Sequence, residues 1–328
     1  RKMRKINLFI HPGYGKAGTT LLQNEIFSKI DFTNLGKPFY KNDLKEAQYK
    51  VFVPKYDFNP IYPFNVQNDL KNYIIKLEDE IDRSTNINFI LSDEVIFDRI
   101  NYFGDYNIYL LKEIIEKLKE KYILNLKFIL TIRRQSDIVA PAFAYNYHRH
   151  KKNFGSLDKF IEKIISEKNL SQIYCYDELV LKIIKIFNSD IMILPIEELS
   201  LNFDEYVKKL ENYLNISLKN LNFKNKFTNK NHLIKDGEKV WNAKDLEISN
   251  TYKLVRKIHL WLKNFKLYEN YHKKLGFIKK VFLPKEKKVG YIMISDHQKK
   301  ILEKHFEQSN KNLEKIIKIN LKQFEYYK

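Results

Sequence analysis

The sequence of 328 residues contains a single cysteine, Cys175. One cysteine cannot close a disulfide within the chain, and it cannot supply the paired cysteines of a structural zinc site. Glycine and proline are also scarce, with 9 and 8 residues, which excludes collagen-like and linker-dominated chains. The hydrophobic share of 44% fits instead a globular protein that buries a core.

Long apolar runs are absent as well. No uninterrupted stretch approaches the roughly 20 residues that a membrane-spanning helix needs. The basic start, Arg1–Lys5, is not followed by the hydrophobic region of a signal peptide, because polar residues return at His11. We therefore expect a cytoplasmic protein, while an anchor upstream of Arg1 and a peripheral contact with a membrane are left open.

Acidic residues are fewer than basic ones. The chain has 40 Asp and Glu against 59 Lys and Arg, which gives a formal net charge of +19. A field of this sign attracts anions such as nucleotides, nucleic acids, acidic glycans and anionic lipid surfaces. Solvated, lysine-rich helix faces explain the same composition more simply, so charge alone does not select a partner.

Short apolar stretches alternate with amphipathic ones over the first 200 residues. Five stretches are predicted to form strands: Ile6–Ile10, Tyr49–Val53, Ile87–Leu91, Leu126–Ile132 and Ile191–Ile196. Apolar residues at helical spacing predict helices between them: one that follows Gly18, then Asp69–Arg83, Ile108–Tyr122, Asp158–Lys168 and Asp177–Phe187. This alternation predicts an α/β fold in which helices cover a central parallel sheet on both faces.

The last third of the chain has a different pattern. Leu246–Leu267 and Ser295–Ile317 are predicted to be long helices, and the second begins with a capping-box pattern of Ser295 and Gln298. The segment Lys279–Gly290 is rich in lysine and poorly periodic, so we expect a basic loop there.

The most informative motif is HPGYGKAGTT, His11–Thr20, which follows the first predicted strand. Its three glycines, Gly13, Gly15 and Gly18, allow the backbone to turn with positive φ and to bring amide N–H groups close to a ligand. Thr19 and Thr20 stand where the next helix begins, and Lys16 adds a positive charge. Because a helix N-terminus attracts anions, the motif predicts a site for a phosphate or a similar oxyanion.

A Walker A loop does not fit this motif. When Gly15-Lys16 is aligned with the end of G-x-x-x-x-G-K-[S/T], Ile10 stands at the first glycine and Ala17 at the Ser/Thr position. The hydroxyl that usually binds Mg²⁺ is therefore missing. The loop is expected to bind an anion without an obligatory metal.

Lys16-Ala17-Gly18-Thr19-Thr20 after a buried strand resembles the 5′-phosphosulfate-binding loop of sulfotransferases that use 3′-phosphoadenosine 5′-phosphosulfate (PAPS). This resemblance implies PAPS as the co-substrate, no metal, and a catalytic role for Lys16. It also implies that the donor is bound by the residues Gly15, Lys16, Ala17, Gly18, Thr19 and Thr20.

Weaker similarities to the same family extend in blocks from His11 to Tyr326. They imply one three-layer, P-loop-type α/β domain with a central parallel sheet flanked by helices, plus a helical C-terminal part. Residues 1–200 would form the nucleotide-binding core and residues 201–328 the mainly helical part.

The segment Leu130–Tyr145 resembles the family's 3′-phosphate motif. Arg133 takes the place of the arginine, whose planar, permanently charged guanidinium suits a phosphate. Pro141 occupies the place of the motif's serine, and Ser136 is the alternative hydroxyl. A proline there forces the helix to begin near residue 141 or to kink.

The segment Phe89–Phe97 resembles a family segment in which an acidic residue follows a strand. Glu94 is the first candidate for a general base that takes a proton from an acceptor hydroxyl, and Asp93 is the second. Ser92 or Asp93 could equally be an ordinary helix N-cap. Further candidate bases are His11, His148 and His150.

Three remaining features have a structural and a functional interpretation. Ile191–Leu199 resembles a strand–Glu–Glu–Leu segment, in which Glu197 and Glu198 are expected to cap the helix that follows. Ser309 and Asn310 are expected to pack a helix rather than to bind ligand. An aromatic cluster of Phe58, Tyr62 and Phe64 could stack on a sugar or pack on the core.

Together these features predict transfer of a sulfuryl group from PAPS to a hydroxyl or amine of an acceptor. The acceptor would be a carbohydrate, such as a glycan or glycolipid, or another small molecule. The alternatives are an ATP-dependent P-loop kinase, which would need Mg²⁺, and a basic nucleic-acid-binding protein. Since the sequence has no recognisable nucleic-acid-reading motif, we expect no nucleic-acid partner.

Overall fold

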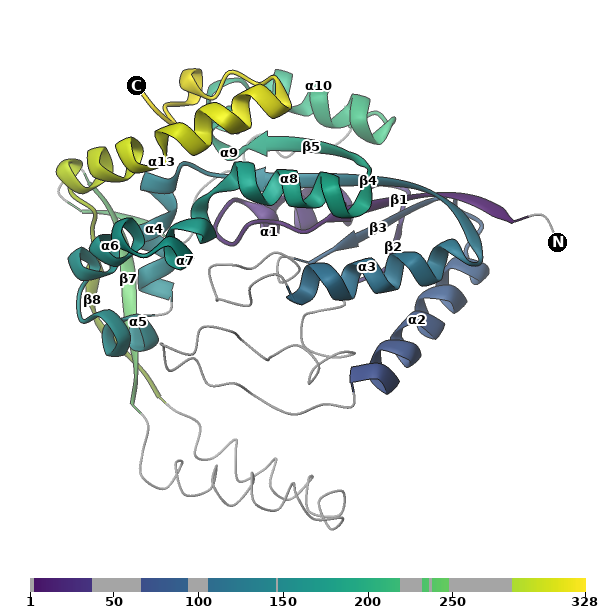
Figure 1. Ribbon diagram of the computed structural model, residues 1–328, viewed down its shortest axis with the longest axis horizontal. Coiled ribbons are helices and arrows are strands. Elements are labelled where there is room, and N and C mark those ends of the chain that lie inside the picture. Colours follow the sequence, from purple (N-terminus) through teal and green to yellow (C-terminus); the bar gives the residue numbers. More distant parts are fainter. Residues whose placement is uncertain are drawn as a thin grey trace, which may run out of the picture.

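The computed structural model describes residues 3–36, 66–93, 106–145, 147–218, 232–235, 238–247 and 285–328. Five parallel strands form the central sheet in the order β2-β3-β1-β4-β5 (Figure 1). Their bounds are Arg4–His11 for β1, Thr33–Asn34 for β2, Asn88–Ser92 for β3, Tyr122–Ile132 for β4 and Asp190–Pro195 for β5. Because the strands are parallel, all their carboxyl ends lie at one edge of the sheet.

Helices cover both faces of this sheet. On one face, Ile6, Leu8 and Ile10 of β1 belong to a core shared with α2 (Val66–Arg83), α3 (Tyr106–Lys119) and α8 (Tyr176–Phe187). On the other face, Phe9 belongs to a second core. The elements of that second layer are α1 (Thr19–Leu22), η1 (Gln23–Phe27), α9 (Ile196–Leu201) and α10 (Phe203–Leu214). The predicted α/β class with a helix-covered parallel sheet is confirmed.

Four predicted strands match β1, β3, β4 and β5, with small shifts at their ends. The expected strand Tyr49–Val53 and the aromatic cluster of Phe58, Tyr62 and Phe64 lie outside the described residues. The helix predicted after Gly18 is α1, which changes into the π-helix η1 at Gln23. Tyr122, predicted to end a helix, instead begins β4.

A run of shorter helices follows β4. The run consists of α4 (Gln135–Tyr145), α5 (Tyr147–Phe154), α6 (Leu157–Ser166), α7 (Lys168–Ser171) and the 3₁₀ turn η2 (Gln172–Tyr174). Pro141 lies inside α4, so of the two expectations for this helix, a start near residue 141 or a kink, the start near residue 141 is excluded. The ring of Pro141 replaces an N–H that would donate to the carbonyl of Asp137.

The C-terminal part contains a sheet that the sequence did not predict. Strands β6 (His232–Lys235), β7 (Glu238–Glu247) and β8 (Lys285–Ile292) are antiparallel, and β7 and β8 contact α4. Leu246 and Glu247, expected to begin a helix, pair with Glu286 and Lys285. The expected basic loop over residues 279–290 is likewise wrong for residues 285–290, which form β8. Lysines are common on edge strands such as β8, where they discourage pairing with other chains.

The chain ends with α13 (Asp296–Ile317), the 3₁₀ turn η4 (Lys322–Phe324) and a short tail of residues 325–328. The predicted capping box is confirmed, since Ser295 and Gln298 exchange hydrogen bonds at the start of α13. Tyr326 and Tyr327 of the tail are buried. Among the described residues, none of the helices has the length and apolar character needed to cross a membrane.

Candidate functional site

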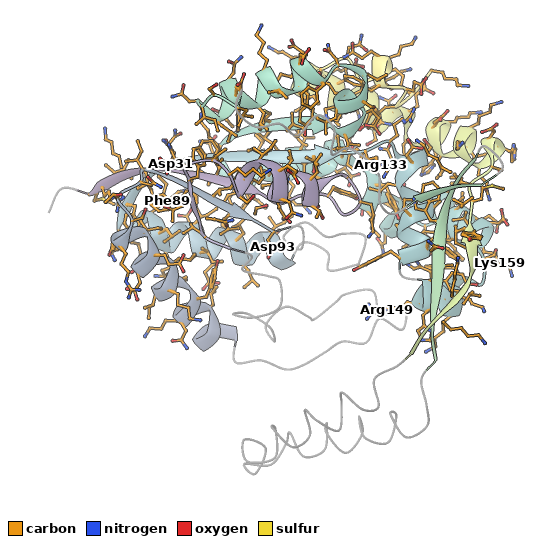
Figure 2. All side chains as sticks on the ribbon, turned by 180° about the vertical axis from the view of Figure 1, so that it is seen from behind. Asp31, Phe89, Asp93, Arg133, Arg149 and Lys159 are labelled. Atoms are coloured by element: carbon orange, nitrogen blue, oxygen red, sulfur yellow. The ribbon has the colours of Figure 1, made fainter. Side chains whose placement is uncertain are left out.

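The polar motifs of the sequence follow strands that end at one edge of the sheet. The glycine loop follows β1, Ser92 and Asp93 end β3, Arg133 follows β4, and Glu197 lies just after β5. Figure 2 labels Asp93 and Arg133 beside the ends of their strands. This edge of a parallel α/β sheet is where ligands usually bind, so these residues define the candidate site.

The glycine loop departs in detail from the expected conformation. Gly13 and Gly18 have positive φ values of 42° and 84°, as predicted, but the third such position is Lys16, with a φ of 67°, and not Gly15. The N–H of Ala17 donates to the carbonyl of Tyr14 at 3.0 Å, so this amide closes a turn within the loop. A non-glycine residue in the left-handed region costs about 1–2 kcal/mol, which indicates that contacts around Lys16 hold it there.

Gly18 is the N-cap of α1 and lies against α9. A Cβ atom at this position would lie 2.4 Å from Cδ1 of Ile196. The carbonyl of Gly18 accepts the N–H of Leu21 at 3.0 Å. Of the two threonines that follow, Thr19 is buried and Thr20 is exposed. The side chain of Thr20 is therefore the more accessible to a ligand.

The structure brings Lys16 and Arg133 together. Nη1 of Arg133 donates to the carbonyl oxygen of Lys16 at 3.2 Å, across 117 positions of sequence. Nζ of Lys16 lies 3.5 Å from the centre of the Tyr145 ring, at the end of α4. A cation over an aromatic face is stabilised by the ring quadrupole. Lys16 is thus held at two points: its carbonyl oxygen binds Arg133, and its ammonium group lies over the ring of Tyr145.

The buried Tyr176 holds the backbone of Arg133. The hydroxyl of Tyr176 donates to the carbonyl of Arg133 at 2.5 Å. Burial raises the pKa of Tyr176 well above its usual range, so the hydroxyl stays a donor. The ring of Tyr14 packs edge-to-face on Tyr176 with centroids 5.0 Å apart. Ser136, the alternative phosphate ligand, is buried near the start of α4.

The candidate bases at the end of β3 have different positions. Glu94 lies outside the described residues. Asp93 is fully buried, and its N–H donates to the carbonyl of His11 at 3.0 Å. Nδ1 of His11 lies 2.8 Å from Oγ of Ser92, which also accepts a bond from Gln23 at 3.0 Å. His11, Ser92 and Asp93 therefore form one buried polar group beside the glycine loop.

His150 is a core residue rather than a base. Its ring is stacked against Phe143 and Phe160, with centroid separations of 5.4 and 4.8 Å. Nδ1 lies 3.2 Å from the carbonyl of Phe143. Burial lowers its pKa to about 4, which keeps the ring neutral. His148 lies on the same helix, α5, and is partly exposed.

Glu197 and Glu198 are structural residues, as expected, but they do not cap the helix that follows, α10, whose N-cap residue is Asn202. Glu197 accepts the backbone N–H of Arg134 at 2.9 Å and the hydroxyl of Tyr326 at 3.0 Å. Glu198 pairs with Lys209 of α10. Burial raises the pKa of Glu197, while the bonds from Arg134 and Tyr326 oppose that shift.

Ser309 and Asn310 also have packing roles. Nδ2 of Asn310 donates to Gln135 at 3.0 Å and to the carbonyl of Tyr326 at 3.1 Å. Ser309 donates to Asp177 on α8. These bonds fix α13 to α4, α8 and the tail.

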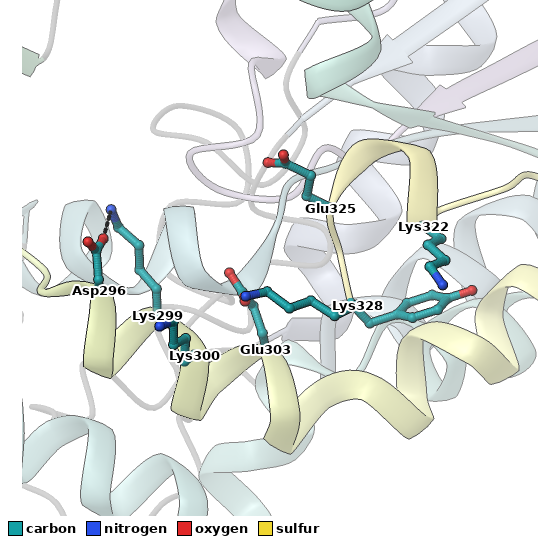
Figure 3. Close-up of a pocket in the computed structure, with 8 residues that line it drawn as sticks. Asp296, Lys299, Lys300, Glu303, Lys322, Glu325 and Lys328 are labelled. Atoms are coloured by element: carbon teal, nitrogen blue, oxygen red, sulfur yellow. Dashed lines mark hydrogen bonds and ion pairs between the residues drawn. The ribbon is translucent and has the colours of Figure 1, made fainter.

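A surface groove of about 420 Å³ lies between α13 and the tail (Figure 3). Its walls carry both signs of charge: Asp296, Lys299, Lys300, Glu303, Lys322, Glu325, Tyr327 and Lys328. None of them belongs to the glycine loop or the strand ends. Among the described residues, no group of three or more His, Cys, Asp or Glu side chains is arranged to hold a metal ion.

Sequence analysis did not identify Tyr14, Tyr145, Tyr176 or Gln23 as parts of the site. Tyr14 and Tyr145 lie within the glycine-loop and arginine motifs, so proximity in sequence could have suggested them. Gln23 stands at the change from α1 to the π-helix η1, a kind of irregularity that is frequent at functional sites. Tyr176 is the first residue of a separate helix, α8, and carries no local signal.

Comparison with known proteins gave structural neighbours only. No family model matches the chain, and no curated protein matches its sequence. A crystal structure of a sulfotransferase from Alicyclobacillus acidocaldarius is similar with a TM-score of 0.39 and 13% identity, over 66% of this chain and 83% of that one. The sulfotransferase domain from the curacin biosynthetic pathway is similar with a TM-score of 0.33 and 12% identity, over 67% and 77%.

Proposed function

We propose that this protein transfers a sulfuryl group from PAPS to a hydroxyl or amine of an acceptor and releases adenosine 3′,5′-bisphosphate. The contact between Arg133 and the carbonyl of Lys16 is the observation that carries the proposal. It joins the two motifs that resemble the 5′- and 3′-phosphate sites of PAPS-dependent enzymes. A ligand with phosphates at both ends of one nucleoside would use both motifs.

In the proposed donor site, each of these two motifs binds a different part of PAPS. The glycine loop, with Gly15, Ala17 and Gly18, would surround the 5′-phosphosulfate, and Thr19 and Thr20 would contribute at the start of α1. Arg133 would bind the 3′-phosphate, because a single bond to the loop does not exhaust its five N–H donors. Ser136 remains the alternative hydroxyl ligand.

Lys16 would supply the main electrostatic contribution to the reaction. In the transfer, the bond between sulfur and the 5′-phosphate oxygen breaks while a bond from the acceptor atom to sulfur forms. By analogy with phosphoryl transfer, charge then develops on the leaving phosphate oxygen. An ammonium group at that oxygen stabilises the transition state more than the ground state. To reach it, Nζ of Lys16 would leave the ring of Tyr145.

A general base would take the proton that the acceptor loses. Glu94 is the proposed base, and the buried Asp93 at the end of β3 is the second choice. The acceptor would be a carbohydrate, such as a glycan or glycolipid, or another small molecule, since the net charge of +19 and the exposed ring of Tyr145 suit either.

Lys16→Ala tests the proposal most simply. At saturating PAPS, turnover should fall about 10²- to 10³-fold, the usual loss when one preorganised donor is removed. The loss should be at least as large as that of Glu94→Ala. Lys29→Ala is the matched control, because Lys29 is exposed and, among the described residues, forms an ion pair with Glu25, four positions earlier, at 2.6 Å. Equal turnover of Lys16→Ala and wild type would contradict the proposal.

Ligand-induced stabilisation separates the alternatives. A native-state ligand raises stability by RT ln(1 + [L]/Kd), so the melting temperature reports which ligand binds. The bisphosphate should raise it without a metal. A P-loop kinase would respond to ATP with Mg²⁺ instead, and a nucleic-acid-binding protein would respond to an oligonucleotide in a strongly salt-dependent way.

A further inference from the structure

The C-terminal tail is joined to the candidate donor site by buried hydrogen bonds. Glu197 connects the two, because one of its oxygens accepts the backbone N–H of Arg134 at 2.9 Å and the other accepts the hydroxyl of Tyr326 at 3.0 Å. Tyr326 is 1% exposed and Glu197 is 9% exposed. A buried carboxylate that loses a donor is costly, so both bonds constrain their partners.

The tail also holds the side chain of Arg134. Its guanidinium pairs with Asp137 of α4 at 2.6 Å and with Glu325 of the tail. The tail is itself fixed on α13, since the carbonyl of Tyr326 accepts a bond from Asn310 at 3.1 Å. Glu197 therefore holds the backbone of Arg134, and Glu325 of the tail holds its side chain.

The neighbouring residue, Arg133, transmits this constraint to the glycine loop. Its carbonyl accepts the hydroxyl of Tyr176 at 2.5 Å, and its Nη1 donates to the carbonyl of Lys16 at 3.2 Å. Lys16 has a left-handed backbone that its own preferences do not favour. A shift at the end of β4 would move Arg133 and break its hydrogen bond to the carbonyl of Lys16. The left-handed backbone of Lys16 would then lose one of the contacts that hold it.

We infer that Tyr326 is a positioning residue for the donor site: through Glu197 and the end of β4 it keeps Arg133 and the glycine loop in the binding conformation. The tail around it is then a part of the site and not merely the end of the domain. This inference rests on the proposed function for the identity of the ligand, but the order of the loop can be measured without any ligand.

The test compares two single-atom changes in the same tail. Tyr326→Phe removes the hydroxyl that binds Glu197. Tyr327→Phe removes the hydroxyl that donates to Glu314 of α13. Within the part of the chain that the structure describes, Glu314 makes no ion pair or hydrogen bond with Arg134. Both variants lose one tyrosine–carboxylate bond of the tail, but the bond of Tyr326 is buried and that of Tyr327 only partly buried. The unfolding free energy of each variant is therefore measured as well, and exchange of the loop amides is compared with that of amides in α13, which a general loss of stability would speed equally.

Two readouts are needed. Hydrogen exchange of the amides from Gly13 to Thr20 should become about 3-fold faster or more in Tyr326→Phe and stay within about 1.5-fold of wild type in Tyr327→Phe, the sizes expected when one hydrogen bond is lost. The Kd for adenosine 3′,5′-bisphosphate should rise roughly 3- to 10-fold in Tyr326→Phe only. Equal exchange in the two variants would overturn the inference.

A second variant covers the case in which Tyr326→Phe does not fold. Glu197→Gln keeps an acceptor for the N–H of Arg134 but weakens the bond from Tyr326, and it should speed exchange of the same loop amides. Wild-type exchange there would also overturn the inference. If the wild-type protein does not bind the bisphosphate, the proposed function fails, whereas the comparison of exchange rates still decides the role of Tyr326.

Discussion

At Gly18 the backbone leaves little room for a side chain. Its φ is +84°, and a Cβ would lie 2.4 Å from Cδ1 of Ile196, closer than real contacts allow. Local sequence predicted that this glycine turns the chain, and the structure confirms it. The contact between Gly18 and α9 could not be predicted from the sequence. Ile196 follows β5, and it comes close to the loop because β5 pairs with β4 in the folded sheet.

Gly18→Ala should destabilise the protein by about 2–4 kcal/mol, since strain at positive φ adds to a collision. Gly155→Ala is the matched control: its φ is +82°, but its nearest neighbour, Cδ of Lys159, is 3.9 Å away. Denaturant unfolding should show a smaller loss there, about 1–2 kcal/mol. Ile196→Val, which removes Cδ1, should recover part of the loss in the double variant. Equal losses at both glycines would mean that the contact with Ile196 is unimportant.

His150 makes the stability depend on pH. Burial lowers its pKa to about 4 from an ordinary 6.5, so the unfolded chain binds a proton more readily than the folded one between these values. Stability contributed by the neutral ring is present above pH 6.5 and is lost as the pH falls toward 4, by up to roughly 3 kcal/mol.

The measurement is the difference in unfolding free energy between wild type and His150→Phe from pH 4 to pH 7. Other groups cancel in this difference, and Phe keeps the packing between Phe143 and Phe160. The wild-type curve should fall more steeply on acidification. Parallel curves would contradict a buried neutral histidine.

At the scale of elements, three long helices in the described part of the chain end in a left-handed residue, and two of these residues suit that conformation. Asn188 ends α8 and Asn215 ends α10, with φ values of 45° and 56°. Lys318 ends α13 with a φ of 55°. Asparagine tolerates the left-handed region much better than lysine does.

Lys318→Gly should therefore stabilise the protein by about 0.5–1 kcal/mol, because glycine adopts this conformation without steric cost. Asn215→Gly, at the equivalent position of α10, should change stability less. Thermal unfolding of the two variants gives the comparison. A destabilised Lys318→Gly would show that the lysine side chain makes a contact that outweighs its backbone strain.

Elements with strong local signals were predicted well, and those built by distant pairing were not. β1 and β3 are short apolar runs buried on both faces, which identifies them from sequence alone. Leu246 and Glu247 were predicted to begin a helix, but they pair with Glu286 and Lys285 of β8. The many lysines in the sequence of β8 conceal its strand character. Partners about 40 positions apart override the local preference, and nothing near Leu246 reports them.

At the scale of the whole molecule, the parallel sheet explains how much of the site was predictable. Strand ends collect at one edge, so the glycine loop, Asp93 and Arg133 were expected near one another. Their contacts were not predictable: Arg133 could bind a ligand alone, yet it also holds the carbonyl of Lys16. The roles of Glu197 and Tyr326 depend on a tail that meets α9 only after the chain has folded.

The central claim is that the glycine loop binds the sulfate carrier without a divalent ion. Calorimetric titration with adenosine 3′,5′-bisphosphate in the presence of a chelator tests it most directly. We expect saturable binding at one site, unchanged by the chelator and at least about 10-fold weaker in Lys16→Ala, since a charge-assisted bond contributes about 1.5–3 kcal/mol. No heat of binding in the wild-type protein, or binding only when Mg²⁺ is added, would contradict the account.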